Sequence, residues 1–144
     1  MAARRELARR SLGDFACMVD IPTVPLSDEA EEDRFSVMKL DSLADHHALL
    51  CDKLQDVESG AIQNLMVLMP PGSAKSTYAD VVFIPWFMTR KPRRNVILAS
   101  YASEIAQKQG RRARQLISSR SFQNLTGRSM KADNRAVHQW SLDN

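Results

Sequence analysis

Two short runs of consecutive apolar residues interrupt a chain in which apolar positions otherwise recur mostly at helical spacing. The first run is Leu65–Met69 and the second is Val96–Ala99. Unbroken apolar runs of this length are typical of strands that are buried on both faces of a parallel sheet. We therefore predict a strand at each run.

Helical patterns precede and follow the first run. Ser42 lies three residues before Asp45, which is the spacing of a capping box, and Gly60 is placed to end the helix that follows. After the run, a second helix is predicted to begin near Lys75. Pro85 should end or kink this helix, because its ring clashes with the carbonyl group four residues earlier.

A third helix is predicted from about Ser103 to Ser118, and residues 137–142 are a candidate third strand. The order strand, loop, helix, strand, helix favours an α/β fold with a parallel sheet and right-handed crossovers. Lys108, Arg111 and Arg112 share one face of the third helix. This face could contact DNA phosphates or act as an arginine finger across a subunit boundary, and a solvated surface explains it equally well.

The first 41 residues differ in character from the rest of the chain. Residues 1–10 are predicted to form an Arg-rich helix or tail, residues 21–25 a loop, and residues 28–33 a mobile acidic cluster. Residues 1–58 carry 7 Lys+Arg against 13 Asp+Glu, whereas residues 59–144 carry 13 against 4. The basic part suggests a phosphate-rich partner, although a solvated surface accounts for it as well. We divide the chain into a flexible acidic segment with a short helix, 1–41, and a domain over 42–144.

The composition excludes several classes of protein. A length of 144 residues corresponds to one domain at most, and an apolar content of 44% argues against general disorder. No apolar stretch approaches the ~18 residues that span a membrane, and the charged N-terminus is not followed by a signal-peptide core. Cys17 and Cys51 form no ligand cluster, which suits a reducing cytoplasm. Membrane, secreted and disulfide-stabilised proteins are therefore not expected.

The candidate chemistry lies between the first apolar run and the second helix. A phosphate-binding loop needs small residues whose backbone N–H groups approach an anion, a Lys for the terminal phosphates and a hydroxyl for Mg²⁺. Within this segment Lys75 is the candidate phosphate ligand and Ser76 the candidate Mg²⁺ ligand. The candidate cradle consists of Gly72, Ser73, Ala74, Lys75, Ser76 and Thr77.

The match to the common pattern G-x-x-x-x-G-K-[ST] is imperfect. Met69 stands at the first Gly position and Ala74 at the Gly before the Lys. A positive φ at Ala74 would cost roughly 1 kcal/mol, because its Cβ crowds the backbone. A turn of small residues that merely starts a helix is the alternative interpretation.

Two adjacent histidines, His46 and His47, fall early in the first helix. Without carboxylate or Cys neighbours they do not make a metal site. We interpret them as surface or boundary residues, with a contact to adenine or to a neighbouring helix as the alternative.

Residues 61–77, AIQNLMVLMPPGSAKST, closely resemble the variant Walker A segment of the large terminase subunits of tailed bacteriophages and prophages. The resemblance covers about residues 42–144. It includes the helix before this segment, the strand at 95–102, the Arg-bearing helix at 106–117 and the final residues 140–144. Ala before the Lys is a form associated with this family.

The resemblance implies a motor protein with a P-loop NTPase-type parallel sheet and flanking helices. Such proteins use ATP with Mg²⁺ to drive double-stranded DNA into an empty capsid, and a second domain cuts the DNA. Lys75 would then be a catalytic residue and Ser76 a metal ligand. The implied partners are phage DNA, a small terminase subunit, a portal protein and further copies in a ring. The implied location is the cytoplasm of a bacterial host, transiently at the procapsid portal, without membrane association.

Other parts of such a motor are not found in the sequence. A Walker B element needs an apolar strand that ends in paired acids, and Asp143 follows a strand candidate that is too short and too polar. The acidic nuclease residues are also not found. We therefore expect an N-terminal portion of the ATPase domain, with an incomplete sheet, which binds nucleotide weakly without hydrolysing it. The alternatives are another P-loop NTPase, such as a helicase or small kinase, and a non-catalytic prophage remnant or basic DNA-binding piece.

Overall fold

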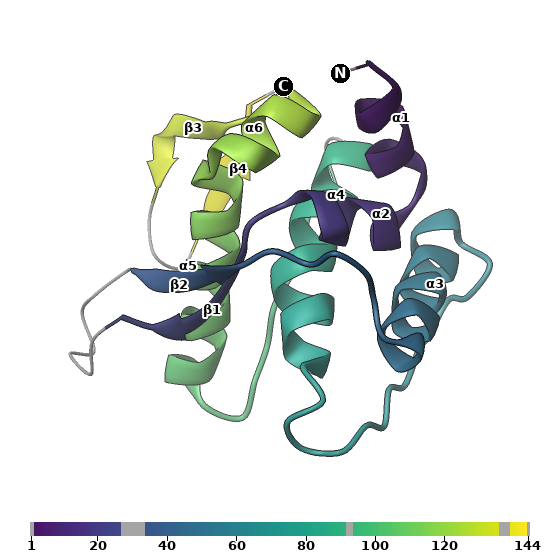
Figure 1. Cartoon of the computed structure of the whole chain (residues 1–144). Coiled ribbons are helices and arrows are strands. Elements are labelled where there is room, and N and C mark those ends of the chain that lie inside the picture. Colours follow the sequence, from purple (N-terminus) through teal and green to yellow (C-terminus); the bar gives the residue numbers. More distant parts are fainter. Residues whose placement is uncertain (1, 27–33, 92–93, 136–138, 144) are drawn as a thin grey trace.

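The structure, a computed structural model, describes residues 2–26, 34–91, 94–135 and 139–143. Its helical elements are α1 (Ala2–Arg10), α2 (Leu12–Met18), α3 (Asp45–Ser59), the π-helical turn η1 (Thr77–Val82), α4 (Phe83–Arg90), α5 (Ser103–Ser118) and α6 (Arg120–Thr126) (Figure 1). Its strands are β1 (Ile21–Pro25), β2 (Phe35–Met38), β3 (Met130–Arg135) and β4 (Trp140–Leu142).

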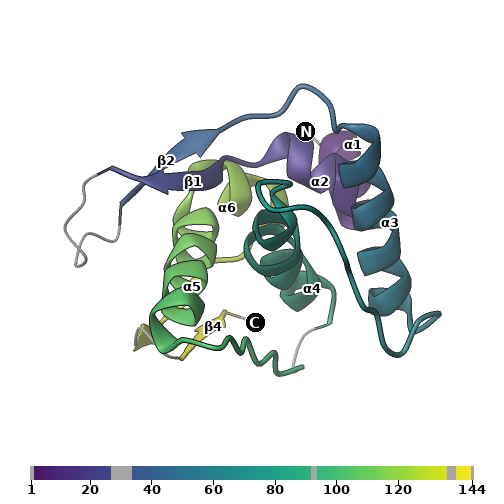
Figure 2. The ribbon, with the colours of Figure 1, turned by 90° about the horizontal axis from the view of Figure 1, so that it is seen from below.

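Three helical segments run in the same direction through the molecule. α3, the continuous segment η1–α4 and α5 all begin at the lower end in Figure 1 and rise from there. Seen from below in Figure 2, α4 lies between α3 and α5. The β1–β2 hairpin and α2 cover one side of this row, and β4 with residues 94–100 lies on the other. The connections after α3 and α4 therefore return along the molecule to its lower end.

The segment η1–α4 supplies the centre of the hydrophobic core. Tyr78, Val82 and Trp86 follow one another at intervals of four residues and are 2%, 0% and 1% exposed. This spacing puts the three side chains on one helix face. The indole Nε1 of Trp86 donates a hydrogen bond of 2.8 Å to the Ala8 carbonyl in α1. The first 41 residues therefore share one core with the domain predicted over 42–144, and they contribute Ala8, Leu12, Phe15, Ala16, Val19 and Ile21 to it.

The N-terminal segment contains more regular structure than the sequence pattern indicates. Residues 2–10 form a helix, as one of the two predicted alternatives required. The loop predicted at 21–25 is wrong: β1 pairs with β2 in an antiparallel hairpin, with Ile21 opposite Met38. Its two prolines lack an N–H and lower strand propensity, but a two-stranded hairpin has only edge strands, where proline is tolerated. The acidic cluster predicted at 28–33 lies outside the described residues.

Helix α3 ends where the sequence predicts and begins later than it predicts. Gly60 has a φ of +85° and its N–H donates to the Val57 carbonyl at 3.1 Å, so it closes the helix in the left-handed conformation. The predicted capping box is wrong. The N-cap is Ala44, which provides no side-chain hydrogen bond, and the helix starts at Asp45.

Pro85 does not end the second helix, which continues to Arg90. The turn just before the proline is π-helical, and the N–H of Phe83 donates to the carbonyl of Tyr78 five residues earlier. A π turn redirects the carbonyl groups that precede the proline, so the ring is accommodated without breaking the helix. The predicted helix end at Pro85 is therefore wrong, and the irregular turn lies before the proline.

The two strands predicted from the apolar runs are not formed. Residues 65–69 and 94–100 are extended or irregular, without ladder partners among the described residues. Side chains at 65–69 alternate between half-buried and exposed, and Met66 and Leu68 are 83% and 86% exposed. Ile97 is 91% exposed. An apolar run predicts a buried strand only if neighbouring strands supply both hydrogen bonds and cover, and no such neighbour is described here.

The later elements agree better with the sequence. The third helix spans Ser103–Ser118, as predicted. The third strand is present in part as β4, and it pairs antiparallel with β3, with Met130 opposite Leu142. Residues 136–138, which the prediction also included, lie outside the described residues.

The molecule is therefore a mixed α/β protein in which the described sheets are two small antiparallel pairs. A parallel sheet is not seen in the described part of the chain. None of the described helices is long and apolar enough to cross a membrane.

Two glycines offer a matched test of backbone conformation. Gly60→Ala should lower the free energy of unfolding by about 1 kcal/mol, because alanine is strained at positive φ even though the space around Gly60 is open. Gly110→Ala should raise it by about 0.5–1 kcal/mol, because Gly110 lies inside α5 with open space around it. Urea denaturation of the two variants measures both changes. Equal effects of the two substitutions would contradict the left-handed end of α3.

Candidate functional site

The sign of the backbone angle φ alternates along residues 72–75. Gly72 has a φ of +79° and Ala74 a φ of +57°, while Ser73 and Lys75 keep φ on the ordinary negative side. The N–H of Ser73 donates to the Pro70 carbonyl at 3.3 Å, which closes a turn just before the helix. Successive residues of alternating hand turn their N–H groups toward one concavity, the arrangement known as an anion nest.

The helix begins directly after this turn. The N–H of Tyr78 donates to the Ala74 carbonyl at 3.2 Å, and Ser76 is helical with φ −65° and ψ −28°. Lys75 and Ser76 therefore lie in the first helical turn, where backbone N–H groups lack acceptors within the helix and the dipole favours negative charge. Ser73, Lys75 and Ser76 are all half-buried. The Ser73 Oγ atom is itself buried and has no hydrogen-bond partner among the described residues.

A carboxylate lies one turn beyond the candidate metal ligand. Asp80 is half-buried and accepts a hydrogen bond from the Ser76 side chain. Burial raises the pKa of the Asp80 carboxyl, and the opposing effects of Arg112, Lys75 and Ser76 do not cancel this rise. The Asp80 carboxylate, in the second helical turn, thus interacts with two cations, Lys75 at the helix start and Arg112 of α5.

Arg112 of α5 faces the protein interior and is 7% exposed. Its Nε and Nη2 atoms donate to the Pro22 carbonyl at 3.1 and 2.7 Å, and Nη2 also donates to Thr77 Oγ1 at 2.9 Å. Burial lowers the pKa of the guanidinium, and Asp80 opposes that shift. The interpretation of Arg112 as part of one solvated face with Lys108 is therefore wrong, since Arg112 joins β1 to the start of η1.

His47 of α3 contacts the loop from the side opposite to Arg112 of α5. Its Nε2 lies 3.0 Å from the Ser73 carbonyl oxygen, and its ring centroid lies 4.4 Å from that of Tyr78. The His46 ring lies 4.0 Å from the His47 ring on the same helix. Burial raises the pKa of Tyr78 to about 12, so this phenol is neutral at physiological pH. The contact to a neighbouring helix that the sequence left open is thus present for His47.

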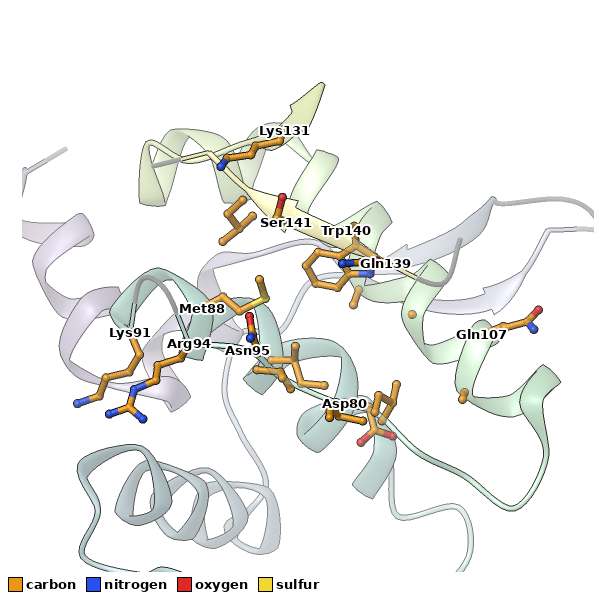
Figure 3. A pocket seen from close by; sticks show the side chains of 18 of the residues that line it. Asp80, Met88, Lys91, Arg94, Asn95, Gln107, Lys131, Gln139, Trp140 and Ser141 are labelled. Atoms are coloured by element: carbon orange, nitrogen blue, oxygen red, sulfur yellow. The ribbon is translucent and has the colours of Figure 1, made fainter. Parts of the chain in front are cut away.

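The candidate cradle does not contribute to the lining of a nearby cavity. That cavity has a volume of about 740 Å³ and lies between α4, α5, β4 and residues 94–98 (Figure 3). Its walls combine apolar and polar side chains, with Trp140 and Met88 facing it, and Lys91 and Arg94 at one end. Of the residues around the loop, Asp80 reaches this cavity.

Within the described parts of the chain, no group of three or more His, Cys, Asp or Glu side chains is arranged to hold a metal ion. Comparison of the chain with protein-family models, with curated proteins and with solved structures gives no match.

The structure thus brings the predicted cradle together with three side chains that the sequence did not assign to it. Asp80 could have been found from its spacing, because residue 80 lies four positions after Ser76 and so on the same helix face. Arg112 and His47 come from other helices, and no local pattern connects them with residues 72–77.

Ala74→Gly tests the left-handed backbone before the helix. We expect the free energy of unfolding to rise by about 0.5–1 kcal/mol, because relief of the Cβ strain at positive φ exceeds the added entropy of glycine in the unfolded chain. Ala48→Gly, inside α3, should instead lower it by about 1 kcal/mol. Thermal or urea denaturation measures both, and a loss of stability in Ala74→Gly would rule out the left-handed conformation.

The raised pKa of Asp80 predicts a pH dependence of stability, and Asp143, whose pKa is lowered, predicts the opposite dependence as a control. Because the folded pKa is raised, wild type should gain stability relative to Asp80→Asn as the pH falls through the folded pKa toward the ordinary value near 3.8. The pKa of Asp143 is lowered by hydrogen bonds from the Ser129 N–H and hydroxyl. Wild type should therefore lose stability relative to Asp143→Asn as the pH falls from the ordinary value through the lower folded one. Urea titrations between pH 7 and pH 2.5 measure both differences, and trends of the same sign would show that one assignment is wrong.

Proposed function

We propose that residues 72–77 bind the phosphates of ATP with Mg²⁺, and that the chain is an N-terminal ATPase segment of the terminase large subunit type. The observation that carries this proposal is the positive φ of Ala74. A nonglycine residue adopts this conformation at a cost, and the position is the one where the common phosphate-loop pattern has Gly. Strain of this kind is characteristic of loops that hold a ligand.

The residues of the cradle fit a nucleotide phosphate chain. The alternating backbone supplies N–H groups, Lys75 supplies a half-buried positive charge, and Ser73 Oγ is a buried hydroxyl that has no partner in the described part of the chain. Ser76 and the Asp80 carboxylate beside it supply oxygen atoms of the kind that Mg²⁺ prefers. When bound, ATP supplies the phosphoanhydride bond whose hydrolysis releases energy for work.

The helix arrangement supports a parallel sheet in the complete fold. α3, η1–α4 and α5 all run in one direction, so the segments that connect them must run in the opposite direction (Figure 1). Residues 65–69 and 96–99 lie within these connections, which is where an α/β fold has its parallel strands. We propose that both become strands of a P-loop NTPase-type sheet when further strands pair with them.

Binding without hydrolysis is the activity that we propose for this chain. Asp143, the one acid that follows a strand candidate in the C-terminal part, has its carboxylate engaged by the N–H and hydroxyl of Ser129 at 2.7 Å each. Its carboxylate therefore holds Ser129 beside the β3–β4 pair rather than being free to ligate Mg²⁺. The proposed parent activity, translocation of double-stranded DNA with a small terminase subunit and a portal protein, rests on the sequence resemblance. The same applies to a homo-oligomeric ring in the cytoplasm of a bacterial host.

Lys75→Ala should weaken binding of Mg²⁺ with a nonhydrolysable ATP analogue by at least about tenfold, because one charge-assisted contact to phosphate is lost. Lys53→Ala removes the same charge from the exposed face of α3 and should leave the dissociation constant unchanged. Isothermal titration calorimetry measures both. Thermal unfolding of each variant without nucleotide checks that the fold is retained.

Wild-type chain that binds no nucleotide would exclude the proposal and favour the noncatalytic remnant. Equal binding by wild type and Lys75→Ala would place the nucleotide elsewhere. Loading of DNA into a capsid distinguishes a helicase-like NTPase from the terminase type. Only an activity of the terminase type would require a portal protein.

A further inference from the structure

The ring of His47 is held between two aromatic neighbours and one backbone carbonyl. Its centroid lies 4.0 Å from that of His46 and 4.4 Å from that of Tyr78, and Tyr78 is 2% exposed. A side chain packed against a buried ring on a neighbouring element has few accessible rotamers. The position of Nε2 at 3.0 Å from the Ser73 oxygen is therefore set by the packing of α3 against η1.

The direction of this hydrogen bond follows from its acceptor. A backbone carbonyl oxygen only accepts, so Nε2 carries the hydrogen and donates it. A neutral ring with hydrogen on Nε2 and a protonated ring both satisfy this requirement.

The contact also fixes the direction of the next N–H group. The Ser73–Ala74 peptide is planar and trans, so its C=O and N–H point in opposite directions. Because the carbonyl is directed to His47, the Ala74 N–H points away from α3. The carbonyl oxygen, which would repel an anion, is thereby kept on the far side of the peptide from that N–H.

We propose that His47 is a positioning residue for the phosphate-binding loop, which it keeps in the anion-binding orientation by holding the Ser73 carbonyl. This inference rests on the proposed function, since it assigns a role to His47 in that same site. His47 does not touch the phosphates, and it acts through one peptide group. The left-handed conformation of Ala74 needs such a restraint, because without one the strained peptide can rotate to relieve its Cβ.

Three variants separate this role from simple packing. His47→Phe keeps an aromatic ring against Tyr78 and removes the donor. His47→Gln restores an N–H donor at similar reach. His46→Phe is the matched control, because the His46 ring lies tilted against the His47 ring and, among the described residues, makes no hydrogen bond to the loop.

The first readout needs no ligand. The carbonyl ¹³C chemical shift of Ser73 and the amide ¹⁵N shift of Ala74 report the hydrogen bond and the peptide orientation. Both should change in His47→Phe, return toward wild type in His47→Gln and stay unchanged in His46→Phe.

The second readout is binding of the Mg²⁺ complex of a nonhydrolysable ATP analogue. His47→Phe should bind about three- to tenfold more weakly, as expected for the loss of one hydrogen bond, and His47→Gln should recover most of this loss. Thermal unfolding confirms that each variant is folded. If His47→Phe does not fold, His47→Gln and a His47→Leu variant are compared by the same two measurements.

The possible results distinguish the positioning role of His47 from the proposed function. Wild-type affinity in a folded His47→Phe, or an unchanged Ser73 carbonyl shift, overturns the positioning role and leaves the proposed function standing. Equal loss in His47→Phe and His47→Gln assigns the effect to packing and also overturns it. A wild-type chain that binds no nucleotide overturns the proposed function, and the role of His47 falls with it.

Discussion

The burial of one face of the segment η1–α4 is the constraint on which the other contacts depend. Tyr78, Val82 and Trp86 form a single buried stripe, so the helix can neither rotate nor slide without exposing large apolar side chains. Trp86 fixes α1 through its indole N–H, and Tyr78 provides the surface against which the His47 ring packs. Because the helix is fixed at its centre, the residues at its start are fixed as well.

Several groups at the start of this helix lower the stability of the fold unless other contacts compensate for them. Ala74 adopts a left-handed backbone, Asp80 is half-buried with a raised pKa, and Arg112 is almost fully buried. Arg112 is stabilised by the Pro22 carbonyl and Thr77, and Asp80 compensates part of its charge. Such a concentration of strain and buried charge is more common at functional sites than in parts of a protein that serve only to support the fold. This is the physical reason for proposing that the function lies at this end of the molecule.

Whereas charged groups are buried at the start of this helix, several apolar side chains elsewhere are exposed. Met66, Leu68 and Ile97 are more than four-fifths exposed, and they lie on the two extended connections between parallel helices. An exposed backbone that lacks ladder hydrogen bonds, together with apolar side chains, favours pairing with further strands. The cavity beside residues 94–98, lined by both apolar and polar side chains, borders one of these connections.

The sequence by itself determined the elements whose signals are local. The spacing of apolar positions located the helix at 103–118 and the body of the helix that ends at 59, although not its start. The glycine at 60 marked the end of that helix, and the small residues before Lys75 located the turn at the start of the central helix. It also identified the risk of strain at Ala74, because the loop pattern requires glycine at that position. These signals depend on neighbours within about four residues, so they can be read along the chain.

Only the tertiary structure decided which residues share an environment. Apolar runs at 65–69 and 96–99 predicted strands, yet strand formation depends on partners from distant parts of the chain, and none is paired with them in the described residues. The capping box failed because Ala44, rather than Ser42, precedes the first helical residue. The sequence allowed Arg112 to belong to a solvated face, but the β1–β2 hairpin covers it. The sequence placed His47 at a boundary, but the packing of α3 beside the loop brings it to the site. Burial and contact between residues 26 to 90 positions apart are properties of the assembled chain, which is why no local pattern specified them.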